Sequence, residues 1–101
     1  MTTEENFDRL EEIVLSTGDV DRKYIVRDII FCGTETSTNL FAPETDLNAI
    51  LTPLKNDLKQ QALSYGADAV INCHFDYHRH QDKIDVLAYG TVVQFIQSTI
   101  G

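Results

Sequence analysis

The chain has 101 residues, of which 43% are hydrophobic and 24% are charged, and sixteen acidic against eight basic side chains give a formal net charge of −8. This length and composition are typical of one globular domain, and the negative charge opposes binding to nucleic acid or to anionic membrane surfaces. No apolar run approaches the roughly 18 residues of a bilayer span and the N-terminus is acidic, unlike a signal peptide, so we expect a cytoplasmic protein.

Residues 1–10 are expected to form an acidic arm or a short helix ahead of a single domain over residues 11–101. Phe7, Leu10 and Ile13 recur at spacings of three with acidic residues between them. This spacing is a weak helical signal, so both interpretations of the N-terminal segment stay open.

Two strands are predicted before the middle of the chain. The first is short and covers residues 13–17; the second covers Tyr24–Gly33, where β-branched and aromatic residues are frequent. The Arg27–Asp28 pair in the second strand indicates a bend or bulge at a sheet edge. The polar segment 34–45 is predicted to be a long loop, and exposure of Leu40–Phe41 in it would offer a surface to a protein partner.

The strongest periodic signal predicts one long amphipathic helix. Its apolar residues recur every three or four positions and share one helical face: Leu47, Leu51, Leu54, Leu58, Ala62 and Tyr65. Thr45 or Asp46 can cap its N-terminus, and Gly66 lies where helices commonly end. Because the apolar stripe continues in phase beyond Pro53, we favour one helix kinked there over a helix that begins at Pro53 with Thr52 as its cap.

Two further strands are predicted after the helix. In residues 69–77 apolar residues alternate with polar ones, which indicates one buried face and one polar face. The apolar residues are Ile71, Cys73, Phe75 and Tyr77. Residues 78–83 are predicted to be a hairpin connection, and the last strand covers residues 84–96. The order β-β-α-β-β predicts an α+β domain with a mostly antiparallel sheet. The last strand is apolar on both faces, and because one helix can cover only one of them, a second subunit is the best cover for the other.

A histidine-rich stretch offers the best candidate for a metal site. His74, Asp76, His78 and His80 occupy every second position, so in an extended strand they project from one face with neighbours about 6 to 7 Å apart. Imidazole and carboxylate groups are ordinary ligands for divalent transition-metal ions. The solvated face of a strand that runs into a hairpin is the commoner origin of such a pattern. Cys32, beside the long loop, is a weaker candidate ligand.

The remaining reactive groups give little sign of catalysis. Cys73 lies between two apolar residues of its strand and is predicted to be a core residue, and the spacing of Cys32 and Cys73 matches neither a redox pair nor a zinc knuckle. No residues have the spacing of a known catalytic motif. We therefore predict that the chain is not an enzyme.

Segment 58–71, which contains Gly66-Ala67-Asp68-Ala69-Val70, resembles the helix, turn and following strand of the YbjQ-like family, a heavy-metal-binding family of uncharacterised function. Three other segments resemble further strands of that family: residues 15–20, 24–31 and 88–93. The similarity extends from about Glu11 to Phe95. The turn motif also has a plain physical explanation, because Gly66 ends the helix and two alanines allow close packing of helix on sheet.

The resemblance implies a compact subunit that assembles into a ring, typically a homopentamer, and it implies no enzymatic activity. The family often carries a Gly-Arg-rich segment before the helix, where this chain has residues 34–45, so a ligand that used such a basic loop is not expected here. We therefore predict a cytoplasmic, non-enzymatic oligomer that binds a metal ion or a small ligand. The alternative is a protein-interaction module that uses the 34–45 loop.

Overall fold

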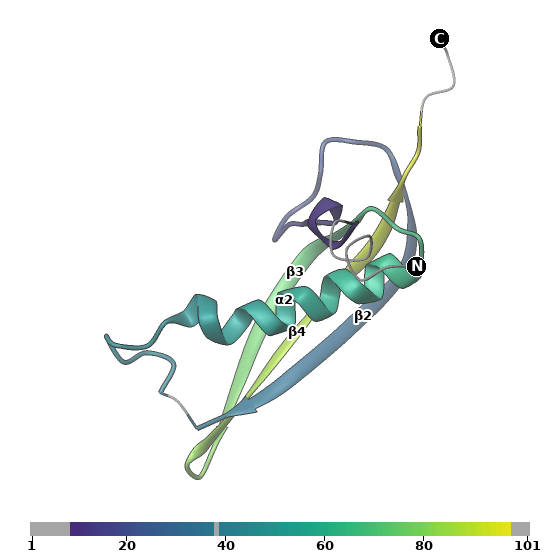
Figure 1. Ribbon diagram of the computed structural model, residues 1–101. Coiled ribbons are helices and arrows are strands. Elements are labelled where there is room, and N and C mark those ends of the chain that lie inside the picture. Colours follow the sequence, from purple (N-terminus) through teal and green to yellow (C-terminus); the bar gives the residue numbers. More distant parts are fainter. Residues whose placement is uncertain (1–8, 38, 98–101) are drawn as a thin grey trace.

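The computed structural model describes residues 9–37 and 39–97 (Figure 1). The elements follow the order β1 (Val14–Leu15), β2 (Tyr24–Thr36), α2 (Leu47–Ser64), β3 (Ala69–His80) and β4 (Lys83–Phe95). Residues 9–12 form a further short helical segment, while residues 1–8, on which the N-terminal prediction mostly rests, lie outside the described residues. The predicted α+β class and the order β-β-α-β-β are confirmed.

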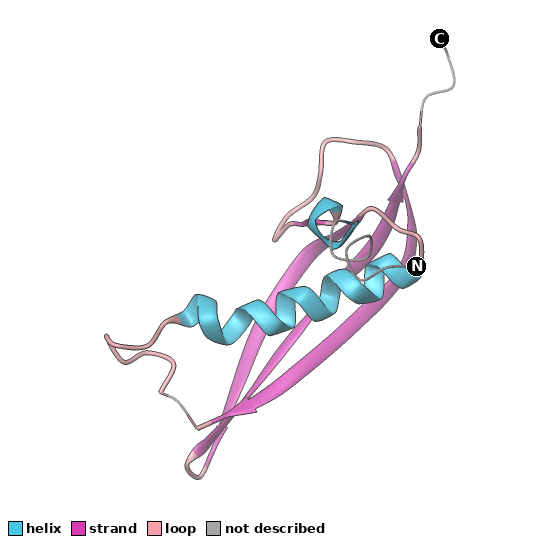
Figure 2. Cartoon of the chain, in the orientation of Figure 1, coloured by secondary structure: helices cyan, strands magenta, loops and turns pink. Residues whose placement is uncertain are grey.

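The four strands form one sheet in the order β1-β3-β4-β2 (Figure 2). β4 lies in the middle and pairs antiparallel with both β3 and β2. β1 pairs with β3 in parallel. The sheet is therefore mixed, and the prediction that it is mostly antiparallel is wrong, because the alternation of residues within a strand does not record its direction relative to a distant neighbour.

The helix α2 begins and ends close to where its sequence predicts. The Asp46 carboxylate accepts hydrogen bonds from the backbone N–H groups of Asn48 and Ala49, which makes Asp46 the N-terminal cap. At the other end Gly66 has a φ of 68°, the left-handed conformation that glycine adopts without strain. Pro53 lies inside the helix, so the alternative of a helix that begins at Pro53 is wrong.

The main core lies between α2 and one face of the sheet. Leu58 and Ala62 of the helix are fully buried there and pack with residues of all the longer strands, including Ile30, Val86 and Val92. A smaller cluster lies on the opposite face at one end of the sheet, where the 16–23 segment passes over it. It consists of Ala69, Ile71 and Val93, with Val20, Tyr24 and Phe95 packed against them.

Most of the sheet face opposite α2 is uncovered, and we call it the open face. Directly paired residues on neighbouring strands share a face, so the register assigns alternate residues of β2, β3 and β4 to this side. Four large apolar residues on it are 41–58% exposed: Val26, Ile29, Phe31 and Leu87. As the sequence predicts, the single long helix covers only one face of the sheet. Cover of the open face by a second subunit stays a prediction.

The sheet contains two irregularities, of which the sequence predicted one. The predicted bulge at Arg27–Asp28 is confirmed by a register shift between Val26 and Asp28. A second shift follows Ile71, where Asn72 has a φ of 52°, and it places Ile71 in the cluster of the open face and Cys73 in the main core. Phe75 and Tyr77 are exposed, so the prediction that both lie on a buried face is wrong. Their cross-strand partners Ala88 and Val86 are buried, so the cover over β4 does not extend across this part of β3, where β3 is the outer strand.

The segment between β2 and α2 is shorter than its sequence predicts. Residues 34–36 continue β2 in register with β4, so the connection begins at Ser37. The two apolar residues of this connection behave differently, since Leu40 is 6% exposed and Phe41 is 64% exposed. The expectation that both are exposed therefore holds for Phe41 alone.

Candidate metal centre

The histidine-rich stretch is strand over its whole length. His78 pairs with Asp85 and His80 pairs with Lys83, leaving a two-residue turn at Gln81 and Asp82. The predicted hairpin connection is therefore confirmed, but its turn has two residues instead of covering 78–83. A two-residue turn favours φ > 0, and Gln81 adopts a φ of 53° without the Gly or Asn that usually marks such turns.

The four predicted ligands of the histidine-rich stretch all lie on the open face, as their spacing predicts: His74, Asp76, His78 and His80. The register pairs them with alternate residues of β4, from Tyr89 opposite His74 to Lys83 opposite His80. Extended strand separates each of these side chains from the next by a full pleat repeat. The strand alone therefore spreads the four groups along the open face, and a compact site needs ligands from neighbouring strands.

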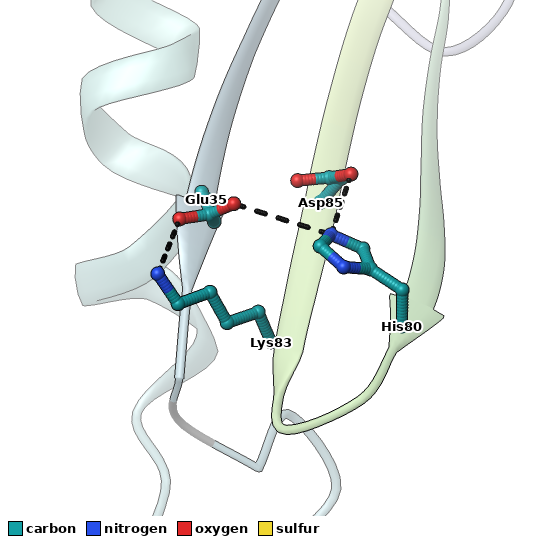
Figure 3. A network of polar contacts seen from close by, with 4 residues as sticks. All are labelled: Glu35, His80, Lys83 and Asp85. Atoms are coloured by element: carbon teal, nitrogen blue, oxygen red, sulfur yellow. Dashed lines mark ion pairs between the residues drawn. The ribbon is translucent and has the colours of Figure 1, made fainter.

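Such a cluster exists at the hairpin end, where Glu35 of β2, His80 of β3 and Asp85 of β4 converge (Figure 3). His80 Nε2 lies 3.0 Å from Asp85 Oδ2 and 4.0 Å from Glu35 Oε2, and the three potential ligand atoms lie within 4.8 Å of one another. Lys83 Nζ lies 3.2 Å from the other Glu35 oxygen, Oε1. Three adjacent strands thus present one imidazole and two carboxylates to a common point.

The donor set of this cluster fits a divalent ion of borderline hardness. One neutral imidazole and two carboxylates match the ligands of zinc, nickel or cobalt, whereas copper(I) and other soft ions prefer thiolates. The side chains of Glu35, His80 and Asp85 are 49%, 43% and 52% exposed. A bound ion would keep coordination positions open to water or to another ligand, and water around the site would weaken its electrostatic attraction.

The other predicted histidine-strand ligands have different neighbours. The His74 ring stacks on Tyr89 at 5.3 Å between centroids, and its Nδ1 lies 2.8 Å from the backbone oxygen of Asn72. His78 stacks against His80 at 6.1 Å. With Asp76, His78 lines a groove of about 430 Å³ beside the cluster. Among the described residues, the cluster therefore includes only His80 of the four.

Sequence reasoning missed Glu35 and Asp85. A two-residue hairpin turn would have placed Asp85 opposite His78 and one pleat from His80, so the register of the hairpin was the signal for Asp85. No local signal exists for Glu35. It reaches the cluster because β2 pairs with β4 over a long antiparallel ladder in which Glu35 is opposite Asp85.

Cys32 lies on the other side of the sheet from the cluster. Its Sγ is 3.5 Å from the backbone oxygen of Leu54, and the thiol packs against the main core under α2. Burial raises the pKa of Cys32 to about 11, and the negative charge of Asp57 adds to the effect. Burial also raises the pKa of Cys73. Because the thiolate is the metal-binding form, both cysteines are poor ligands at neutral pH.

The raised pKa predicts slow alkylation of Cys32. Raising the pKa of the thiol from its ordinary value near 9 to about 11 lowers the thiolate fraction at pH 8 roughly 100-fold. A more basic thiolate is also more nucleophilic, which recovers about a factor of ten in rate. In a Cys73→Ser variant, Cys32 is thus expected to react with iodoacetamide about tenfold more slowly than free cysteine does. A rate equal to that of free cysteine would contradict the assigned burial.

No helix among the described residues is long and apolar enough to cross a membrane.

A family model and a solved structure both match this chain. A model of the YbjQ family, described as "Putative heavy-metal-binding", matches residues 20–96. A solved structure from Pediococcus pentosaceus, a protein of unknown function of the DUF74 family, superposes with a TM-score of 0.66 at 18% identity. The match covers 83% of this chain and 98% of that one, so the two share a fold. No curated protein matches the sequence.

Proposed function

Because the chain belongs to the YbjQ family, we propose that it is a cytoplasmic, non-enzymatic oligomer that binds a divalent transition-metal ion at Glu35, His80 and Asp85. The observation that carries the metal component is the convergence of three ligand atoms from three adjacent strands within 4.8 Å. The donor set supports zinc, nickel or cobalt. In this proposal the ion is the ligand of the protein, and no reaction is assigned to it.

The position of the cluster connects metal binding with assembly. Its three side chains lie on the open face, next to apolar residues that are uncovered in the single chain, including Phe31 and Leu87. Contiguous exposed apolar surface of this kind is typical of an interaction site. A neighbouring copy on this face would add ligands or exclude water, so each chain needs to supply fewer ligands. We take five as the number of subunits from the family resemblance.

Metal binding is tested by substitution of His80. In calorimetric titrations with Zn²⁺, His80→Ala is expected to weaken binding at least tenfold, because it removes the only imidazole of the three-ligand set. His74→Ala is the matched control: it also removes one histidine from the open face of β3, but His74 stacks on Tyr89 away from the cluster. Zn²⁺ binding that is absent in the wild type, or equal in His80→Ala, would disprove the metal component.

The alternative is a protein-interaction module in the connection before α2. Phe41 favours it, since this residue is 64% exposed. The ring nevertheless makes an edge contact with Tyr77 at 5.3 Å between centroids, and the neighbouring Leu40 is buried in the main core. The connection thus offers one aromatic side chain, whereas the open face offers four large apolar residues, and we prefer the open face as the interaction surface.

A further inference from the structure

Lys83 lies beside the metal cluster and shares one of its ligands. Its Nζ is 3.2 Å from Oε1 of Glu35, while Oε2 of the same carboxylate is 4.0 Å from Nε2 of His80 (Figure 3). The register holds Lys83 in this position, because it is the direct cross-strand partner of His80 at the closed end of the hairpin. The Glu35 carboxylate therefore lies between an ammonium group and the other two ligands.

An ammonium group beside a ligating carboxylate can act in two opposite ways. It can orient the carboxylate as an outer partner of the metal, and loss of such a partner weakens metal binding. It can instead compete with the metal, because both cations bind the same carboxylate and repel each other. The two roles predict opposite changes of metal affinity when the charge of Lys83 is removed.

The exposure of the ion pair favours competition. The side chains of Lys83 and Glu35 are 53% and 49% exposed, so their pairing is held weakly and can exchange with another cation. The lysine ammonium is also a point charge on a flexible stem, which fixes the orientation of a carboxylate less well than a planar guanidinium does. Orientation by Lys83 is therefore a weak benefit, while its positive charge opposes a divalent ion directly.

The spacing of the ligands supports the same conclusion. Ligands of a tetrahedral ion with bonds of about 2.0–2.1 Å lie about 3.3 Å apart. Asp85 already approaches His80 to 3.0 Å, whereas Glu35 stays at 4.0 Å and keeps its other oxygen on Lys83. Glu35 must therefore move closer to His80 to share an ion with it, and the pair with Lys83 opposes that movement.

We propose, as an extension of the proposed metal site, that Lys83 is a built-in competitor for Glu35 that limits the affinity of the cluster for divalent cations. The ammonium group neutralises Glu35 when no metal is bound and is displaced from it when a metal binds. The cluster then takes up metal only when the ion concentration is high enough to displace the lysine.

Charge removal at Lys83 tests this role. In titrations with Zn²⁺, Lys83→Gln is expected to lower the dissociation constant about two- to fivefold, the size of effect that an exposed ion pair supports. Lys83→Arg keeps the charge and is expected to bind Zn²⁺ no more tightly than the wild type. Lys55→Gln, on the exposed side of α2, changes the net charge equally and is expected to leave the constant unchanged. Thermal unfolding of each variant checks that the fold is intact.

The outcomes separate this proposal from the metal site itself. Equal affinity of Lys83→Gln and the wild type, or weaker affinity of Lys83→Gln, overturns the competitor role while the metal site stands. Tighter binding by Lys55→Gln to the same extent also overturns it, because net charge would then explain the change. If neither the wild type nor Lys83→Gln binds Zn²⁺, both proposals fail together.

Discussion

Replacement of Leu58 by alanine is expected to lower the free energy of unfolding by about 3 kcal/mol. Leu58 lies at the centre of the stripe that α2 buries against the sheet and has no exposed surface. The substitution removes apolar contacts and leaves a cavity that the surrounding strands fill only partly. Since a domain of this size is stable by roughly 5–15 kcal/mol, the loss is a large part of the total. Urea unfolding followed by circular dichroism measures it.

Leu47→Ala is the matched control for this prediction. Leu47 begins the same helix and the same apolar stripe, but it is 44% exposed, so the identical change is expected to cost less than about 1 kcal/mol. Leu58→Met nearly conserves volume and is expected to retain the fold if Leu58→Ala does not. Similar losses for Leu58→Ala and Leu47→Ala would mean that α2 is not packed on the sheet as described.

The sequence was a good guide to elements whose signals are local. The stripe on α2, its cap at Asp46, its end at Gly66 and the bulge after Val26 all follow from the identity and spacing of nearby residues. The hairpin of β3 and β4 was also predictable. The direction and pairing of strands far apart in the chain did not follow, because no local pattern records them. The parallel pairing of β1 with β3 is an example: the two strands are separated by β2 and α2.

The candidate site shows the same division. The face shared by the histidines was predictable from a spacing of two, and His80 is part of the cluster. The other two members depend on register, since Asp85 is set by the length of the hairpin turn and Glu35 by the pairing of β2 with β4. Metal ligands that come from three strands leave no contiguous motif in the sequence.

Disruption of the open face is expected to separate the assembly into single chains. A homopentamer would have five times the subunit mass of 11.4 kDa, about 57 kDa. In a Phe31→Asp/Leu87→Asp double variant, assembly would bury two additional carboxylates against apolar surface, at a cost of several kcal/mol for each ion. Light scattering after size exclusion is expected to show an assembly for the wild type and a mass near 11.4 kDa for the double variant.

The face is a better candidate for this contact than the edge of β2. β2 is an edge strand, but two of its backbone groups are already occupied by side chains: Gln61 Nε2 donates to the oxygen of Phe31 at 2.9 Å, and Asp28 accepts from the N–H of Ile29. Backbone groups that are occupied in this way are not free to pair with a further strand at those positions. The side chains of Phe31 and Ile29, by contrast, remain free of cover on the open face.

Phe41→Asp separates the two candidate surfaces, because Phe41 is at least as exposed as Phe31 but lies in the connection before α2. If copies meet through the open face, Phe41→Asp keeps the mass of the wild type while the double variant does not. If they meet through the connection, the result is reversed. A wild type that is monomeric at micromolar concentration would contradict assembly itself, and Zn²⁺ titration of that monomer would then report on the three ligands of one chain alone.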